Sequence, residues 1–236
     1  EHANYVDRKF YGYNPKEFKK ILGDLDMKMP SGHTVLNKRH WDEAKKDFTD
    51  VWKYTVEDAA VLEQQFVISP AIEDSWRKDL DTLKYYMDVF NKSGELCKKA
   101  GMKFGYHNHH FEFSEKLGGQ TLYDQILQHT DPNLVIQQLD IGNMYYGGGR
   151  ALDVIKKYPG RFASLHVKDE IAVAGSEHGY ESAILGVGVI DVKKVLEEAI
   201  RTGGAIHLII EQESYQGKPA LDCVKEDLQI MKKWGY

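Results

Sequence analysis

Hydrophobic and polar positions along the chain follow two alternating patterns. Residues 14–26 place their apolar side chains at the spacing of one helix face, and Asn14 and Pro15 supply helix-start signals. Residues 65–72 form instead a compact apolar run that Pro70 stops, which is typical of a short buried strand. The chain therefore combines amphipathic helices with buried strands.

The same alternation continues to the end of the chain at a steady rate. Strands are predicted at 27–36, 65–72, 102–113, 134–143, 161–169 and 207–214. Helices are predicted at 14–26, 40–62, 75–100, 121–130, 151–159, 189–204 and 221–234. Strands alternating with helices of this length predict βα units and a parallel sheet. No Pro/Gly/Ser-rich linker interrupts the series, so residues 1–236 are expected to form a single domain.

Two parallel architectures fit this order of elements. An open doubly wound sheet accommodates six strands, but it usually has a Gly-rich phosphate loop after its first strand, and none is present. A closed (β/α)8 TIM barrel needs eight strands and about 250 residues. The chain opens at Glu1, and residues 1–15 have neither strand nor signal-peptide character. We therefore predict a (β/α)8 TIM barrel that lacks its first one or two βα units.

This interpretation has consequences for assembly and location. In an incomplete barrel the strands at 27–33 and 206–212 each lack a neighbour, and exposed edges invite pairing with another chain, so a homo-oligomer is compatible with the sequence. Any targeting signal would lie upstream of Glu1, which leaves a cytoplasmic and a periplasmic location both open.

Composition narrows the classes of partner. The formal net charge is −5 and the pI is about 6.1, so there is no broad basic surface for a nucleic-acid backbone. A membrane-spanning helix needs about 18 or more consecutive apolar residues, and no apolar run in the chain approaches that length. Cys97 and Cys223 lie far apart without a CxxC spacing and read as ordinary thiols, although one disulfide stays open. We expect neither a nucleic-acid nor a membrane partner.

Ligand-type side chains stand where four successive predicted strands end: Glu112, Asp140, His166 and Glu211. The carboxyl ends of parallel barrel strands converge on one face, where barrel enzymes build their sites. Carboxylates with one imidazole suit a divalent cation such as Mn²⁺, Co²⁺, Mg²⁺ or Zn²⁺. Three buried carboxylates would also repel one another without a cation between them. The pattern predicts one divalent metal ion.

Structural alternatives exist for two of these residues. Asp140 precedes Ile-Gly-Asn and could cap the next turn, and His166 could be a core histidine bonded to the backbone. Glu211 follows four apolar residues, where an unpaired carboxylate is costly, so a functional role is favoured. Near the third predicted strand, His107 and His109 should share one face and His110 the other.

Five strings in order carry a family resemblance: YHNHHFEF, QLDIGN, SLHVKD, LGVGVID and IIEQES. Together they resemble the xylose isomerase-like TIM barrels, specifically the sugar phosphate isomerase/epimerase group, from about Asp26 to the C-terminus. The resemblance implies a divalent metal held by two glutamates, an aspartate and a histidine. Carried over, these are Glu112, Asp140, His166 and Glu211.

The sequence departs from the family pattern at the first ligand. Many relatives place that glutamate directly at the strand end, where this chain has His107 or His109, so the first ligand is either Glu112 or a histidine. The resemblance also implies substrate-facing roles for His33 in MPSGHT and for Lys168 in HVKD. A solvated position at the barrel rim is the structural alternative for Lys168.

Such a site supports proton movement next to a carbonyl of a small sugar or sugar derivative. We expect Glu211 and Glu112 to act as the acid–base pair, with His107 and His109 contacting sugar hydroxyls. The predicted activity is a sugar isomerase or epimerase that works through an enediolate. The alternative is elimination, as in keto-inositol dehydratases or 3-keto-glycoside lyases of the same superfamily.

Two other classes fit less well. An apurinic endonuclease of the same fold needs a richer histidine set and a basic surface, against which the acidic pI argues. A non-catalytic sugar-binding barrel would not need two glutamates on the metal.

Overall fold

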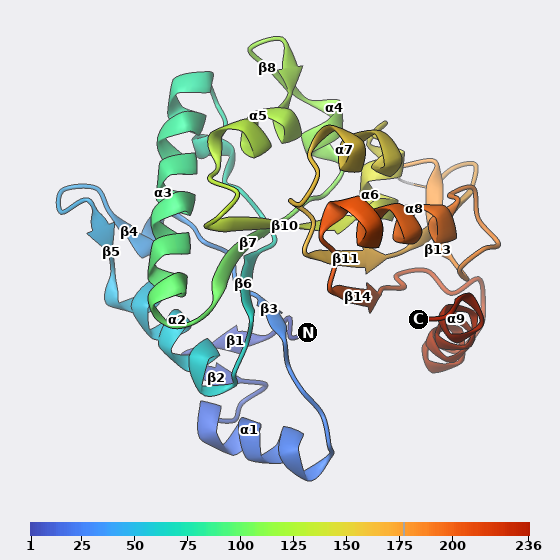
Figure 1. Ribbon diagram of the computed structural model, residues 1–236, viewed down its shortest axis with the longest axis horizontal. Helices are drawn as coiled ribbons and strands as arrows, with labels where there is room; N and C mark the ends of the chain where they lie inside the picture. The colour runs from blue at the N-terminus through green and yellow to red at the C-terminus, as the bar shows by residue number, and fades with distance from the viewer. Residues whose placement is uncertain (177) are drawn as a thin grey trace. The chain divides into compact units, whose positions relative to one another are not determined.

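Parallel strands followed by helices make up most of the chain (Figure 1), which a computed structural model describes over residues 1–176 and 178–236. The described residues form two compact units. The first comprises residues 1–107 with 125–136, and the second comprises residues 108–124 with 137–236. Helix α5 (Leu122–His129) and strand β10 (Val135–Asp140) begin in one unit and end in the other.

The first unit is built on three parallel strands: β3 (Ser31–His33), β6 (Phe66–Ser69) and β7 (Lys103–His107). Strand β6 lies between the other two. Its helices are α1 (Pro15–Asp24), α2 (Asp50–Val61) and α3 (Leu80–Lys99). Helix α3 packs along β7 (Figure 1). It begins where the Asp79 side chain accepts a hydrogen bond from Thr82 N at 2.7 Å, later than the predicted start at Ser75.

Helix α1 forms where the sequence predicts it. Asn14 and Glu17 make reciprocal side-chain bonds to each other's backbone N–H at 3.0 and 3.1 Å, a capping box that fixes the first turn. The inner face buries Phe18 and Leu22 in a cluster with Phe10, Met29 and Leu62.

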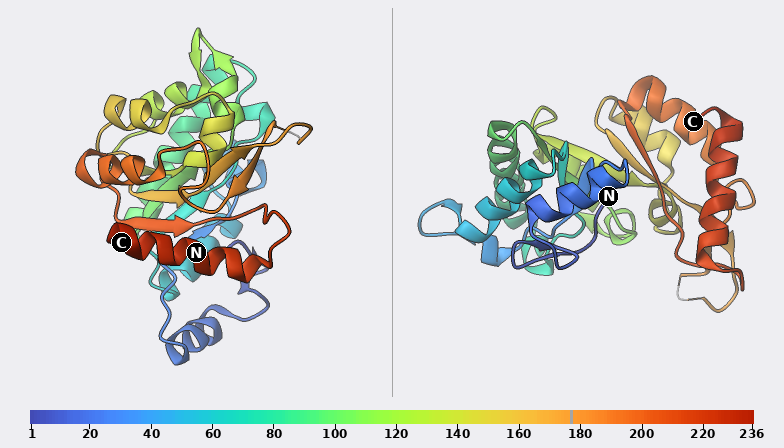
Figure 2. Two further views of the ribbon diagram at one scale, coloured as in Figure 1. Left: turned by 90° about the vertical axis from the view of Figure 1, so that its right-hand side faces the viewer. Right: turned by 90° about the horizontal axis from the view of Figure 1, so that it is seen from below.

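The second unit also has a parallel sheet, in which β11 (Ser164–Val167) lies between β10 and β14 (His207–Ile210). Its helices are α4 (Phe111–Ser114), α6 (Ile141–Tyr146), α7 (Ala151–Lys157), α8 (Val192–Glu198), a π-helix at Ala199–Gly203, and α9 (Ala220–Trp234). Helix α9 runs beside β14 (Figure 2). An antiparallel hairpin of β12 (Asp169–Ala172) and β13 (Tyr180–Ala183) follows β11. A smaller hairpin joins β8 (Lys116–Leu117) to β9 (Gln120–Thr121).

Each of the six predicted strands is present among the described residues, although all are shorter than predicted. Over the same residues, no helix is both long and apolar enough to cross a membrane.

The predicted helix at 40–62 was wrong in its first half. A 3-10 helix (Lys38–His40) leads into an antiparallel hairpin of β4 (Trp41–Asp42) and β5 (Asp47–Phe48), and only α2 is α-helical. The Asp42 carboxylate accepts hydrogen bonds from the backbone of residues 44 and 45, each at 3.1 Å, and this closes a turn that competes with the helix.

The predicted strand at 102–113 was also too long. Strand β7 stops at His107, and Phe111–Ser114 is a short helix. The Asn108 side chain explains the break, because it bonds the backbone of Asp140 twice, at 3.0 and 3.1 Å. A side chain thus makes the contacts that a continuing strand would have made with its backbone. His109 and His110 therefore lie outside the strand, and the prediction of their strand faces was wrong.

The N-terminal residues contain a hairpin that the sequence did not indicate. Strands β1 (Tyr5–Val6) and β2 (Lys9–Phe10) pair across Asp7 and Arg8, whose φ angles are +50° and +61°. Two positive φ angles are typical of a type I′ hairpin turn, which usually contains Asn or Gly. Asp7-Arg8 lacks that signal.

Candidate active site

The second unit gathers charged side chains at the ends of its three parallel strands. Asp140 ends β10 and is fully buried. Its Oδ1 accepts a hydrogen bond from Asn143 N at 2.7 Å, so Asp140 does cap α6. Its Oδ2 is directed to other charges: Lys168 Nζ lies 3.1 Å away and His166 Nδ1 lies 4.0 Å away. The capping role and the site role therefore use different oxygens of one carboxylate.

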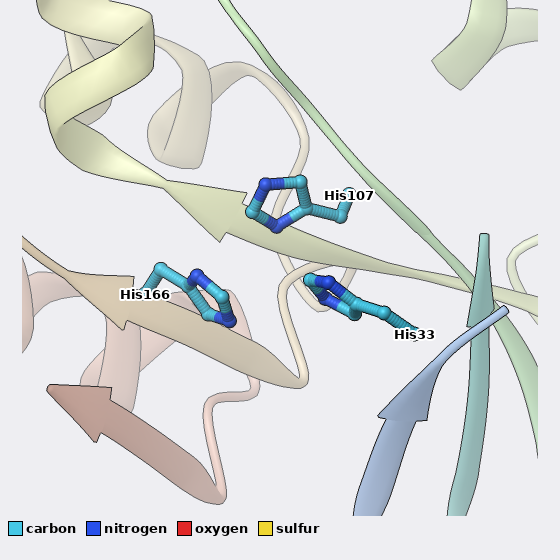
Figure 3. Close-up of side chains that lie close together, drawn as sticks. All are labelled: His33, His107 and His166. Atoms are coloured by element: carbon cyan, nitrogen blue, oxygen red, sulfur yellow. The ribbon is translucent and has the colours of Figure 1, made fainter. Parts of the chain in front are cut away.

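His166 and Glu211 complete the group. Strand pairing sets Asp140 opposite His166 on β11, and Glu211 follows β14 with its backbone N–H bonded to Val167 O at 3.2 Å. His166 Nδ1, on the side chain labelled in Figure 3, lies 3.0 Å from Glu211 Oε2. One ligand atom from each of Asp140, His166 and Glu211 lies within 4.8 Å of the others. The structure therefore brings together three of the four predicted metal ligands.

Lys168 lies within the same cluster. Its side chain is 1% exposed, so the alternative of a solvated rim position was wrong. Besides Asp140, its Nζ lies 2.9 Å from Glu211 Oε2 and 2.7 Å from Glu213 Oε2. It also donates to Asn143 Oδ1 at 3.3 Å. One buried ammonium thus compensates several carboxylates.

The pKa values of the two ligand carboxylates, Asp140 and Glu211, are shifted in opposite directions. Burial raises the pKa of Asp140 above its usual range; Lys168 opposes the rise, and the charge of Glu211 adds to it. Burial acts on Glu211 in the same direction, but the hydrogen bond from His166 and the charges of His166 and Lys168 outweigh it and lower its pKa. Burial would lower the pKa of Lys168, but Asp140, Glu211 and Glu213 raise it. Glu211 is therefore ionised and Lys168 charged at neutral pH.

The donor set fits a divalent cation. Two carboxylate oxygens and one imidazole nitrogen suit Mn²⁺, Co²⁺ or Zn²⁺. Among the described residues, the buried Asp140 Oδ2 makes no direct hydrogen bond, and the charged neighbours of Asp140 are Lys168, His166 and Glu211. His166 Nδ1 lies 4.0 Å from Asp140 Oδ2 and 3.0 Å from Glu211 Oε2. Asp140, His166 and Glu211 are the residues that would hold the ion.

Glu112 stands outside this group of three. It lies on α4, fully buried, and its Oε2 accepts a hydrogen bond from His109 N at 3.0 Å. Burial of the Tyr123 hydroxyl raises its pKa well above the usual range, and the nearby charge of Glu112 adds to this rise. The role of Glu112 as a ligand and as the second acid–base group stays a prediction.

The predicted substrate-facing histidines belong to different parts of the chain. In the first unit, the rings of His33 on β3 and His107 on β7 lie with their centroids 4.8 Å apart (Figure 3). His33 Nε2 lies 3.3 Å from Glu1 Oε2. In the second unit, the His109 ring stacks on Phe111 with centroids 6.2 Å apart, and the His110 ring lies beside Tyr146 and His178. The predicted roles of His33, His107 and His109 toward substrate stay predictions, and none was predicted for His110.

A cleft of about 470 Å³ opens beside Glu213 in the second unit. Tyr146, Glu170, His178, Tyr180, Glu181 and Glu213 line it, with serines between them. We call it the side cleft. Burial raises the pKa of Glu170 to about 7, with Lys168 opposing and the neighbouring carboxylates adding to the rise. Sequence reasoning missed these residues, although Glu170 and Glu213 each lie two positions beyond a residue it had singled out, Lys168 and Glu211.

Asp169 fixes the loop that follows the hairpin. Its two oxygens accept hydrogen bonds from the backbone N–H groups of Glu170, Gly186, Gly188 and Ile190, at 2.8–3.1 Å. A Cβ on Gly188 would lie 2.2 Å from Asp169 Oδ1, so this approach requires glycine. The LGVGVID string is thus a structural clamp next to Lys168.

Related sequences are known among curated proteins. An inosose dehydratase from Clostridium perfringens is 30% identical over 173 residues, which cover 67% of this chain and 56% of that protein. The chain therefore spans about half the length of the curated relatives it matches.

Among solved structures, a sugar phosphate isomerase/epimerase from Parabacteroides distasonis superposes with a TM-score of 0.81 at 23% identity, covering 98% of this chain and 81% of that chain. The IolI protein with a bound zinc atom has a TM-score of 0.71 at 13% identity, covering 95% and 82%. These two likenesses establish the fold. The profile of the xylose isomerase-like TIM barrel family matches residues 2–234. The chain therefore belongs to the xylose isomerase-like TIM barrel family and has its barrel fold.

Proposed function

We propose that this protein is a divalent-metal-dependent sugar isomerase or epimerase that moves a proton on a carbon next to a carbonyl. The observation that carries the proposal is the convergence of Asp140, His166 and Glu211, with Lys168 among them. When bound, the cation supplies Lewis acidity toward the substrate carbonyl. The relatives named an inosose dehydratase and a sugar phosphate isomerase/epimerase support a sugar-like small molecule as substrate.

Glu211 is the residue best placed to accept the carbon-bound proton. Its carboxylate is ionised at neutral pH, and the His166 ring, whose Nδ1 lies 3.0 Å from Oε2, packs beside it. The positive charge of Lys168, 2.9 Å from Glu211 Oε2, favours negative charge that develops on a nearby substrate oxygen as the proton leaves. Asn143 helps to hold the Lys168 ammonium in place. Glu112 is the proposed partner that returns the proton.

Elimination is the second candidate, and two observations favour it. The curated relative at 30% identity is named an inosose dehydratase. Glu170 is 2% exposed and its pKa is raised to about 7, so near neutral pH a substantial fraction of this carboxyl carries a proton that could pass to a departing hydroxide. Both reactions share proton removal by Glu211 and differ in the step that follows.

The test is a screen of ketoses and keto-polyols in D₂O with added Mn²⁺, following deuterium uptake at carbon by NMR. We expect uptake by the wild type and its loss in Glu211→Gln, because the amide cannot accept the proton. Glu226→Gln, on the exposed face of α9, should retain uptake. The products separate epimerisation, isomerisation and elimination. Unchanged uptake in Glu211→Gln would remove that residue as the base.

A further inference from the structure

The side cleft adjoins the candidate active site through Glu213, whose carboxylate forms one wall and also bonds Lys168 at 2.7 Å. On another wall, the Tyr146 hydroxyl donates to Asn143 Oδ1 at 3.0 Å, and Asn143 is also bonded by Lys168. The cleft is thus connected to the charged cluster at two points. Glu213 lies two residues beyond Glu211, and the carboxylates of both residues contact the same Lys168 ammonium, at 2.7 and 2.9 Å.

The charge of the side cleft is negative. Glu170, Glu181 and Glu213 contribute carboxyl groups, and none of its lining residues, taken over the described part of the chain, is lysine or arginine. Lys168, which bonds the lining residue Glu213, is 1% exposed and already compensates Asp140, Glu211 and Glu213. Phosphate sites in proteins use Arg, Lys or free backbone N–H groups as donors.

Backbone donors at this wall are also already used. The Ser182 hydroxyl oxygen accepts hydrogen bonds from Glu213 N at 2.8 Å and Ser214 N at 2.7 Å. These two successive N–H groups are the kind that could otherwise cradle an anion. The cleft therefore offers mainly acceptors, which match the hydroxyl groups of a sugar and oppose a phosphate.

Aromatic rings add an apolar surface. The rings of Tyr146 and His178 stack with centroids 4.8 Å apart and an interplanar angle of 5°. Tyr180 lines the cleft, and its ring lies edge-on to the ring of Tyr145 with the centroids 5.6 Å apart. A sugar ring presents C–H groups on its faces and hydroxyls at its edge. Aromatic faces and carboxylate acceptors together suit both parts of such a ring.

We infer that the side cleft receives an uncharged polyhydroxylated part of the substrate, so that the substrate is an unphosphorylated sugar or polyol. This inference rests on the proposed function, since it names the substrate class of the same site. It distinguishes the protein from an enzyme selective for sugar phosphates.

The experiment compares D-fructose with D-fructose 6-phosphate, which has the same carbon skeleton and a phosphate on O6. Because that phosphate also prevents the pyranose ring, the salt dependence and the charge-reversal variants below separate the effect of charge from that of ring form. Binding is measured by saturation-transfer difference NMR, and turnover as deuterium uptake in D₂O with Mn²⁺. We expect at least tenfold tighter binding of fructose at low salt, and a smaller difference at 0.5 M NaCl because salt screens the repulsion. Equal or tighter binding of fructose 6-phosphate by the wild type would overturn the inference.

Charge reversal locates the effect. Glu181→Lys should shift the preference toward fructose 6-phosphate by at least tenfold. Glu226→Lys changes the net charge equally on α9, away from the cleft lining, and should not shift it. An equal shift in both variants, or none in Glu181→Lys, would contradict the inference. If fructose binds preferentially but neither sugar takes up deuterium, the inference stands and the proposed function fails for this pair.

Discussion

Replacing Lys168 by methionine removes the cation that compensates the buried carboxylates. At about 3 Å and an effective dielectric constant of about 20, each ion pair corresponds to about 5 kcal/mol of gross attraction. Burial of the ammonium offsets much of this, and removing one partner of a buried pair typically costs 3–5 kcal/mol. The side chains of Glu211 and Glu213 are 31% and 63% exposed, so water already screens them in part. We therefore expect a loss of about 3 kcal/mol, caused mainly by Asp140.

The assay is urea unfolding followed by circular dichroism, with EDTA and then with excess Mn²⁺. With EDTA, Lys168→Met should lose about 3 kcal/mol of unfolding free energy. Mn²⁺ should recover more stability in this variant than in the wild type, because a bound cation replaces the missing charge. Lys218→Met removes an exposed partner of Glu226 and should cost less than about 1 kcal/mol. The reasoning fails if Lys168→Met costs no more than this control, or if Mn²⁺ stabilises both proteins equally.

Three further changes test other parts of the structure. Because burial raises the pKa of Glu170 from 4.5 to about 7, wild-type stability relative to Glu170→Gln should fall as pH rises from 4.5 to 7, by at most about 3 kcal/mol. Burial lowers the pKa of His40 from 6.5 to about 4, so wild-type stability relative to His40→Gln should fall as pH drops from 6.5 to 4. Urea unfolding at a series of pH values measures the Glu170 and the His40 effects. A stability difference between wild type and variant that does not change with pH would contradict the role of burial. Asp169→Asn should cost about 2–3 kcal/mol and speed amide exchange at Gly186 and Gly188, since an amide replaces one acceptor oxygen by a donor; unchanged exchange would contradict the clamp.

The strand-end residues were predictable because their position follows from the apolar runs. Asp140, His166 and Glu211 each stand where such a run ends, and parallel pairing then brings them together. Glu112 could not be placed in this way. The Asn108 side chain takes over the pairing of β7, and a choice between backbone and side-chain bonding leaves no periodic signal.

The spacing of apolar residues could not distinguish the hairpin at 41–48 from a helix. Trp41, Phe48 and Trp52 are all buried, and their spacing of seven and four residues matches one face of a helix. The Asp42 turn closes a hairpin that buries the same side chains. Likewise, the burial of Lys168 depends on three carboxylates from distant segments of the chain. The sequence around Lys168 alone therefore could not exclude a solvated position at the barrel rim.

Titration with Mn²⁺ by isothermal calorimetry measures whether Asp140, His166 and Glu211 bind a metal ion. The wild type should bind one ion per chain, and Asp140→Asn and His166→Gln should each weaken binding at least tenfold, because each removes one ligand from the group of three. Glu226→Gln, which changes an exposed carboxylate on α9, should bind as the wild type does. Binding that is absent in the wild type, or equally strong in Asp140→Asn and His166→Gln, would contradict the account.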